Sequence, residues 1–175
     1  GQDGKLLAVE TIGKLSGDRW TKHACTFTAA ATDKQAKFFL QPLSAGMLDV
    51  DVVSLFPRET FKNRPNGCRP DLAELLVGLK PAFLRFPGGC VVEGATMANR
   101  YRWKETIGHV STRPGHWSLW NYRNTDGLGY HEFLQLCEDL DCQGMYVCNC
   151  GLSCPGRNGD FWPDERIDES IQDCL

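Results

Sequence analysis

Helical and strand-like segments alternate along the chain from Pro70 onward. A helix that opens at Pro70 is followed by a short apolar strand, Phe83 to Phe86. A long loop, a second amphipathic helix and a second strand come next, before a third helix opens at Pro163. Alternation of this kind predicts a parallel sheet whose strands are joined by right-handed helical crossovers.

Local signals set the expected bounds of these elements. The first helix begins at Pro70, because proline suits the first helical position, and Pro81 ends it. The second helix is expected from Thr125-Asp126 onward, and the second strand from Met145 to Cys150. Helical spacing of leucines predicts one buried face on the first helix, formed by Leu72, Leu75, Leu76 and Leu79.

The first strand ends abruptly in a Pro87-Gly88-Gly89 turn and carries an arginine, Arg85, within its apolar run. Proline cannot donate to a sheet ladder, and glycines permit a close approach of other groups to the backbone. A buried guanidinium at position 85 would need an anionic partner. This combination at the carboxyl end of a strand is typical of one wall of an α/β active site. The alternative is a tight turn whose arginine extends into solvent.

Residues 5–56 follow a different pattern, in which apolar and polar side chains alternate with a period of two. Short strands at this spacing are typical of an antiparallel β-sandwich. The four expected strands are Lys5–Ile12, Trp20–Ala29, Ala36–Leu40 and Met47–Phe56. Because two parallel strands cannot close a sheet, and a (β/α)₈ barrel needs ~250 residues, we interpret the 175 residues as an excerpt of a longer protein.

The long loop between residues 91 and 124 is rich in aromatic and arginine side chains. Aromatic faces stack on sugar rings, while arginine and asparagine hydrogen-bond hydroxyl groups. The alternative is that most of these aromatic side chains pack the loop down as a satellite core. The aromatic and histidine side chains concerned are Tyr101, Trp103, His116, Trp117, Trp120 and Tyr122.

Composition excludes several classes of function. A net charge of -3 gives no basic surface for nucleic acid, and no apolar run approaches the roughly 20 residues that span a bilayer. The nine cysteines include Cys148 and Cys150 on one face of the second strand, and their spacings do not form paired zinc knuckles. We therefore expect buried free thiols, with no metal, no cofactor and no disulfide framework.

Several long motifs closely resemble the α-L-arabinofuranosidases of glycoside hydrolase family 51. The likeness is to the plant and bacterial branch that carries an inserted, carbohydrate-binding-like β-sandwich, and it is strongest from about residue 45 onward. The motifs that carry it are Leu79–Gly94, Arg102–Gly108, Arg113–His116, Asp126–Gly129 and His131–Gln135.

The resemblance implies an α/β fold that is part of a (β/α)₈ TIM barrel, preceded by part of an antiparallel β-sandwich. Phe83–Phe86 and Met145–Cys150 would be the second and third barrel strands. The expected domains are residues 1–56, the carboxyl-terminal part of the sandwich, and residues 57–175, the amino-terminal part of the barrel.

The activity implied is that of a retaining hydrolase, which releases terminal α-L-arabinofuranosyl residues from arabinose-containing polysaccharides or oligosaccharides. Two glutamates, with carboxyls about 5–5.5 Å apart, would act as acid/base and nucleophile. The family has them on the fourth and seventh barrel strands, beyond Leu175, so no catalytic residue is assigned and the segment alone is expected to be inactive. Glu93, Glu105 and Glu132 are not expected to take these roles.

Substrate-binding residues are carried over from the resemblance only where the motifs match. Arg85 would lie beside the nucleophile and keep that carboxylate ionised. Gly89 and Cys90 would line the sugar pocket, Trp103 would border the leaving group, and Asn149 would end the third strand near the pocket. The resemblance favours a secreted, cell-wall or periplasmic location and leaves open a homo-oligomer of the full-length protein.

Two alternatives remain open at this point. One is a non-catalytic carbohydrate-binding module built on the β-rich first fifty residues. The other is a metal protein whose ligands are cysteines.

Overall fold

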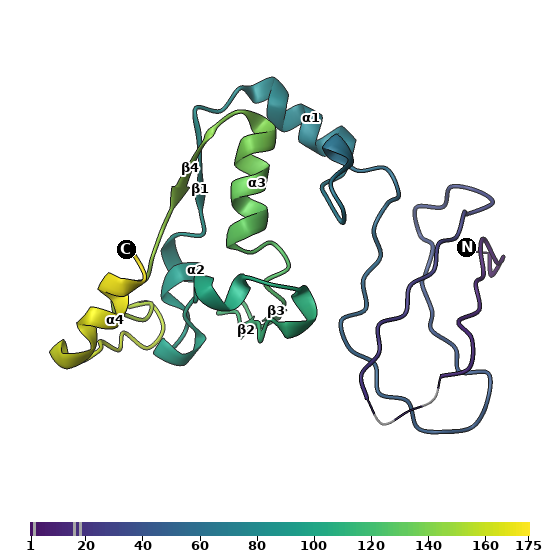
Figure 1. Ribbon diagram of the computed structural model, residues 1–175, viewed down its shortest axis with the longest axis horizontal. Coiled ribbons are helices and arrows are strands. Elements are labelled where there is room, and N and C mark those ends of the chain that lie inside the picture. Colours follow the sequence, from purple (N-terminus) through teal and green to yellow (C-terminus); the bar gives the residue numbers. More distant parts are fainter. Residues whose placement is uncertain (2, 16, 18) are drawn as a thin grey trace. The chain divides into compact units, whose positions relative to one another are not determined.

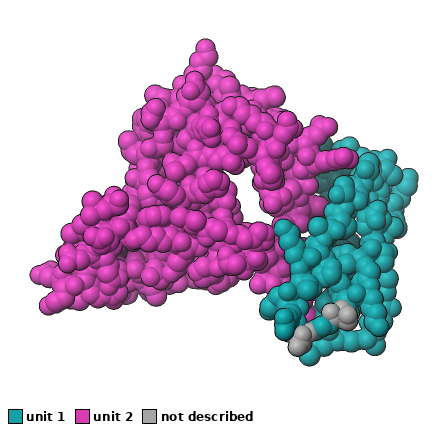
Figure 2. Space-filling view, in the orientation of Figure 1, with its two compact units in different colours: residues 1–48 teal, residues 49–175 magenta. Residues whose placement is uncertain are grey.

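A computed structural model describes every residue of the chain except 2, 16 and 18 (Figure 1). The described chain forms two compact units, residues 1–48 and residues 49–175 (Figure 2). The predicted sandwich segment, residues 1–56, contains the three residues that lie outside the description. In the part that is described, every helix is too short or too polar to cross a bilayer.

The described residues of the first unit form neither a helix nor a strand. A backbone hydrogen bond from Ala30 N to Leu7 O, 2.8 Å long, joins two distant segments, but no ladder continues from it. The four strands predicted between residues 5 and 56 are therefore not formed. The alternation of apolar and polar residues determines which side chains share a face of a strand. A strand forms, however, only where its backbone is hydrogen-bonded to a neighbouring strand along its length.

The second unit contains the predicted parallel sheet. Strands β1 (Phe83–Phe86) and β4 (Gln143–Tyr146) pair in parallel, with Phe83 opposite Gln143. The second strand thus begins and ends earlier than the predicted Met145–Cys150. Val147 N still donates to Phe86 O at 3.0 Å, but the next residue of the first segment is Pro87. Because proline has no N–H to donate, the ladder stops there.

Helix α1 (Pro70–Leu79) has the bounds predicted from its flanking prolines, and the left-handed Lys80 follows its last residue. Its predicted buried face is wrong for this chain: all four leucines are exposed, and Ala73 is the one buried residue of the helix. The spacing of the leucines gives them a common face, but no described element covers it.

Helix α3 (Tyr130–Leu140) begins later than the predicted Thr125-Asp126. Its start is set by a cap, because Glu132 Oε2 accepts a hydrogen bond from Gly129 N at 3.0 Å. Thr106, on a distant loop, also accepts one from Tyr130 N at 3.0 Å. The helix buries Phe133, whose ring stacks on Phe86 with centroids 4.7 Å apart. It thus covers one face of the β1–β4 sheet, beside which it lies in Figure 1.

The long loop is divided into short elements. Helix α2 (Gly89–Glu93) follows β1 directly, and strands β2 (His116–Trp117) and β3 (Arg123–Asn124) pair antiparallel. The third predicted helix is a 3-10 turn after Pro163, followed by helix α4 (Ile167–Gln172). The remaining elements are 3-10 helices, Phe61–Asn63, Met97–Asn99, Trp103–Thr106 and Val110–Thr112.

Candidate functional site

The carboxyl ends of β1 and β4 lie side by side because the two strands are parallel. Helix α2 follows β1 and the segment 147–154 follows β4, so both begin at this edge of the sheet. Cys154 N donates to Gly94 O at 3.0 Å and holds that segment against the end of α2. Parallel α/β proteins place ligands at this edge, and four of the five predicted binding residues lie on β1, on α2 or just after β4.

Arg85 is exposed, so its guanidinium is not buried in this chain, and the alternative in which the arginine extends from a tight turn describes it better. Its side chain leaves the sheet on the face opposite α3, which no described element covers, and none of the ion pairs of the described residues involves it. The guanidinium lies across Gly88, where a Cβ would come 2.6 Å from Arg85 Cζ. Gly88 also has a φ of +87°, so two independent constraints favour glycine there.

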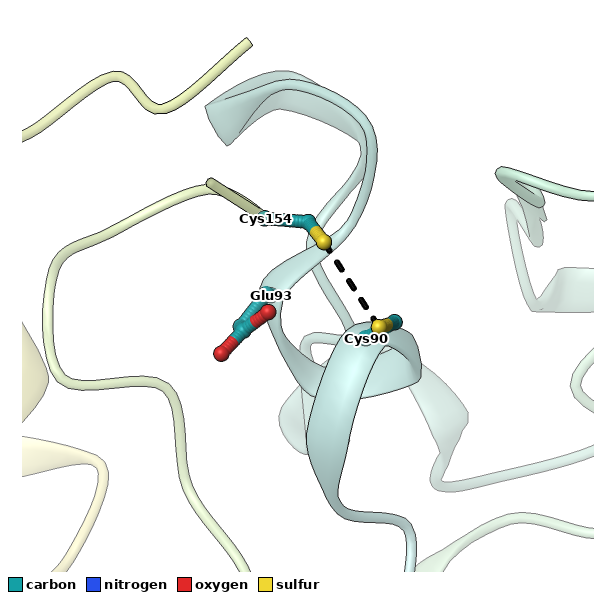
Figure 3. Close-up of side chains that lie close together, drawn as sticks. All are labelled: Cys90, Glu93 and Cys154. Atoms are coloured by element: carbon teal, nitrogen blue, oxygen red, sulfur yellow. Dashed lines mark hydrogen bonds between the residues drawn. The ribbon is translucent and has the colours of Figure 1, made fainter. Parts of the chain in front are cut away.

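Gly89 and Cys90 form the start of α2. Gly89 has a φ of +53°, but the space around its missing side chain is open. Cys90 is exposed, and its Sγ lies 3.6 Å from the Sγ of the buried Cys154 (Figure 3). A hydrogen bond from the Gly156 backbone lowers the pKa of the Cys154 thiol, but Cys90, burial and Glu93 together raise it above its ordinary value.

Asn149 connects the loop after β4 to α2. Its side chain is only 6% exposed, and its amide donates to Val92 O at 3.0 Å and to Leu152 O at 2.8 Å. Its carbonyl oxygen accepts a hydrogen bond from Gly151 N at 2.7 Å. With both amide hydrogens engaged, Asn149 joins the loop after β4 to α2 in this structure.

Trp103 lies in an aromatic cluster. Its ring centroid is 4.9 Å from that of Tyr130 and 6.5 Å from that of Tyr146, and its indole donates to Asp173 O at 2.9 Å. Lys104 Nζ lies 5.5 Å from the same ring. For Trp103 these contacts match the alternative in which loop aromatics pack as a satellite core, whereas Trp117, Trp120 and Tyr122 are exposed.

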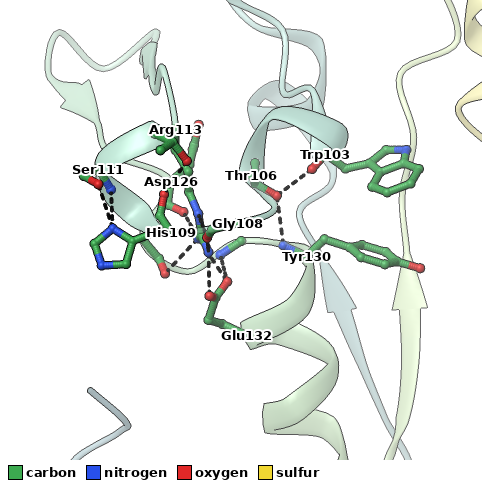
Figure 4. Close-up of polar contacts among 12 residues, drawn as sticks. Trp103, Thr106, Gly108, His109, Ser111, Arg113, Asp126, Tyr130 and Glu132 are labelled. Atoms are coloured by element: carbon green, nitrogen blue, oxygen red, sulfur yellow. Dashed lines mark hydrogen bonds and ion pairs between the residues drawn. The ribbon is translucent and has the colours of Figure 1, made fainter. Parts of the chain in front are cut away.

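Arg113 is the centre of a polar network that holds the long loop to α3 (Figure 4). Its side chain is 3% exposed, and it contacts Glu132 Oε1 at 2.6 Å, Gly108 O at 2.7 Å and Asp126 O at 2.7 Å. Burial opposes ionisation of Glu132, but the hydrogen bonds from Arg113 and from backbone N–H groups outweigh it and lower the pKa of the carboxyl. An acid held ionised in this way is unsuited to donate a proton at neutral pH.

A histidine–aspartate pair in the same loop has no counterpart among the predictions. His116 Nδ1 lies 3.1 Å from Asp126 Oδ2, and both side chains are buried. The Tyr101 ring meets the His116 ring edge-on, 5.8 Å between centroids. A cavity of about 20 Å³, lined in part by Cys90 and His116, lies beside the pair. It has room for about one water molecule, so it does not accommodate a sugar in this chain.

The structure brings some of the predicted residues together. Cys90 and Asn149 both meet at α2, Arg85 lies over the turn that precedes that helix, and Trp103 belongs to the separate aromatic cluster. Sequence reasoning missed Glu93 and Cys154 as neighbours of Cys90. The spacing of Cys90 and Glu93 on one helical turn could have linked those two, but Cys154 is 64 residues away and nothing local points to it.

Comparison with known proteins gives a family match, two relatives and a similar solved structure. The domain family described as Alpha-L-arabinofuranosidase 1 domain matches residues 75–175. Alpha-L-arabinofuranosidase 2 of Arabidopsis thaliana is 43% identical over 150 residues, which are 84% of this chain and 22% of that protein. The extracellular exo-alpha-L-arabinofuranosidase of Streptomyces chartreusis is 35% identical over 183 residues, which are 98% of this chain and 22% of that protein.

A solved structure of an arabinose-bound GH51 α-L-arabinofuranosidase is similar in both fold and sequence. It superposes with a TM-score of 0.60 and 43% identity, over 66% of this chain and 18% of that chain. The chain therefore spans about a fifth of the length of the relatives it matches.

Proposed function

The chain belongs to the α-L-arabinofuranosidases of glycoside hydrolase family 51, and from this premise we propose that it is part of a retaining hydrolase that releases terminal α-L-arabinofuranosyl residues. The observation that carries the proposal is the family match over residues 75–175, which includes β1, β4 and the loops at their carboxyl ends. The proposed substrate is an arabinose-containing polysaccharide or oligosaccharide.

Within that protein, we propose that β1 and β4 are the second and third strands of a (β/α)₈ barrel. A barrel sheet has helices on its outer face and packed side chains on its inner face. Helix α3 supplies the outer cover here, while Phe83, Arg85 and Met145 lie on the other face. The exposure of these side chains, and of the leucines of α1, supports further strands and helices that lie outside this chain. Residues 57–175 would then belong to the barrel and residues 1–56 to the β-sandwich.

Arg85 would act inside the barrel, close to the carboxyl ends of the strands. A guanidinium beside a carboxylate favours the ionised form, which a glycosidase nucleophile requires. Gly88 allows the arginine to lie against the turn, because a side chain there would displace it. Arg85 thus would tune a nucleophile that another part of the protein supplies.

The remaining predicted residues would shape the sugar pocket. Gly89 and Cys90 would form its wall at α2, and Asn149 would hold that wall in place through its bond to Val92 O. Trp103 would stand at the leaving-group side, fixed by the aromatic cluster. Neither Glu132 nor Glu105 would take part in bond cleavage, because the resemblance implies that both catalytic glutamates lie on barrel strands outside this chain. Glu132 instead caps α3 through Gly129 N and binds Arg113, and Glu105 pairs with Arg102.

The location of the protein is proposed to be outside the cytoplasm. The Streptomyces relative is named extracellular, which supports a secreted form.

The direct test is release of 4-nitrophenol from its α-L-arabinofuranoside by two proteins, this chain and a longer protein that contains it. We expect turnover by the longer protein and none by the chain. Arg85→Lys in the longer protein should lower kcat, and Arg69→Lys, at an exposed ion pair with Asp71, is the matched control that should not. Turnover by the chain alone, or none by the longer protein, would refute the proposal.

A further inference from the structure

Three side chains that can bind a metal converge beside α2. Cys90 and Glu93 lie one helical turn apart, and Cys154 comes from the loop after β4 (Figure 3). One ligand atom of each lies within 4.8 Å of the other two. Among the described residues, this is the one group of three cysteine, histidine or acidic side chains arranged in this way.

The separation of the two sulfur atoms fits metal ligands better than a covalent pair. Cys90 Sγ and Cys154 Sγ are 3.6 Å apart. Two thiolates on one tetrahedral zinc, each at about 2.3 Å from the metal, are about 3.8 Å apart. The sulfur atoms of a disulfide are only about 2.05 Å apart.

Hydrogen bonds of the backbone hold both sides of the group without help from a metal. Cys154 N donates to Gly94 O at 3.0 Å, and Cys154 O accepts from Arg157 N at 2.9 Å. Asn149 holds the same loop to α2 through Val92 O. The backbone that carries the three ligands is thus held in advance, so binding would order only their side chains.

We propose that Cys90, Glu93 and Cys154 bind one Zn²⁺ ion. Thiolates select soft or borderline cations over Mg²⁺ and Ca²⁺, and one carboxylate completes a set of three ligands that zinc accepts. Cys90 is exposed, so water can take the fourth position. As each Zn–S bond forms, the thiol proton passes to solvent, and no oxidation or reduction takes place. The bound ion would join α2 to the loop after β4, at the edge where the sugar pocket is proposed.

Two other thiol pairs in the chain provide internal controls. Cys137 interacts with Cys142, and Cys148 interacts with Cys174. In the part of the chain that the structure describes, neither pair has a third ligand close by. If two neighbouring thiols were enough to bind zinc, all three thiol pairs would bind it. The proposal predicts binding only at the Cys90–Cys154 pair, which has Glu93 as a third ligand.

The first test titrates the reduced 175-residue chain with Zn²⁺ in competition with a chromophoric chelator. We expect one tightly bound ion per chain. Cys90→Ser and Cys154→Ser should each weaken zinc binding by more than roughly a hundredfold. Mutation of a residue that only hydrogen-bonds a metal ligand already lowers metal affinity about 10–100-fold, and these two residues are the ligands themselves. Glu93→Gln should weaken binding less, while Cys137→Ser and Cys148→Ser should bind as the unmodified chain does. Equal affinity in all variants would overturn the proposal.

The second test needs no variant and so does not depend on how well one folds. Zn²⁺ should slow maleimide labelling of Cys90 in the unmodified chain, while Cys25 and Cys68, which are also exposed, should label at an unchanged rate. Labelling of Cys90 at the same rate with and without zinc would overturn the site. So would recovery of a Cys90–Cys154 disulfide from the zinc-treated chain in reducing buffer.

Discussion

The two faces of the β1–β4 sheet differ in how completely this chain covers them. On one face, Phe133 of α3 is 1% exposed and stacks on Phe86. On the other, Phe83 is 53% exposed and Met145 is 47% exposed. Both faces come from the same two four-residue strands. The contrast shows that the apolar pattern of a strand specifies a buried position, but that burial itself depends on a second element being present.

The largest effect is expected from truncation on the covered face. Phe133→Ala should lower the free energy of unfolding of the chain by about 3–5 kcal/mol, because it opens a cavity under the sheet. Phe83→Ala, on the uncovered face, is the matched control and should change it by less than about 0.5 kcal/mol. Urea unfolding of both variants measures the difference. Equal losses would mean that the two faces are equally packed.

An intermediate effect is expected at the glycine turn that borders the uncovered face. Gly88→Ala should destabilise the chain more than Gly89→Ala, since both residues have positive φ but only the first meets another group. The strain alone is about 1–2 kcal/mol, and the clash with Arg85 adds to it at Gly88. Thermal unfolding of the two variants would separate the backbone strain, which both share, from the clash with Arg85, which only Gly88→Ala has. The opposite order would show that Arg85 does not lie over the turn.

The smallest effect is expected from pH, and it acts on the covered face through the cap of α3. The folded state lowers the pKa of Glu132, so its contribution to stability is complete above the unfolded-state pKa, about 4.3, and is lost as pH falls through the folded-state pKa. Unfolding free energy should therefore fall in acid more steeply for the unmodified chain than for Glu132→Gln. Parallel pH profiles for the two proteins would contradict this assignment.

Elements with signals in their own sequence could be predicted. Helix α1 has the predicted bounds because Pro70 and Pro81 act locally, and the parallel pairing of the two strands followed from the order of the elements. The start of α3 could not be placed, because Thr106, far away in the sequence, helps to cap Tyr130. The end of β4 depended on Pro87 in its neighbour.

Predictions that depended on contacts with residues far away in the sequence were less accurate. The strands expected in residues 5–56 lack paired neighbours, and Arg85 lacks the buried surroundings that its apolar run suggested. The motifs identified the correct family, and the predicted site residues lie on recognisable elements. Their roles in binding arabinose stay predictions. Cys154 was not linked to Cys90 because only the fold brings them together.

The most direct test is a crystal structure, with arabinose bound, of a longer protein that contains this chain. We predict that the Arg85 guanidinium will be enclosed by a closed barrel, within about 4–6 Å of a glutamate carboxylate from outside residues 1–175. Phe83 and Met145 should be buried in the same structure. An Arg85 side chain that still extends into bulk solvent, on a sheet face that nothing covers, would contradict the account.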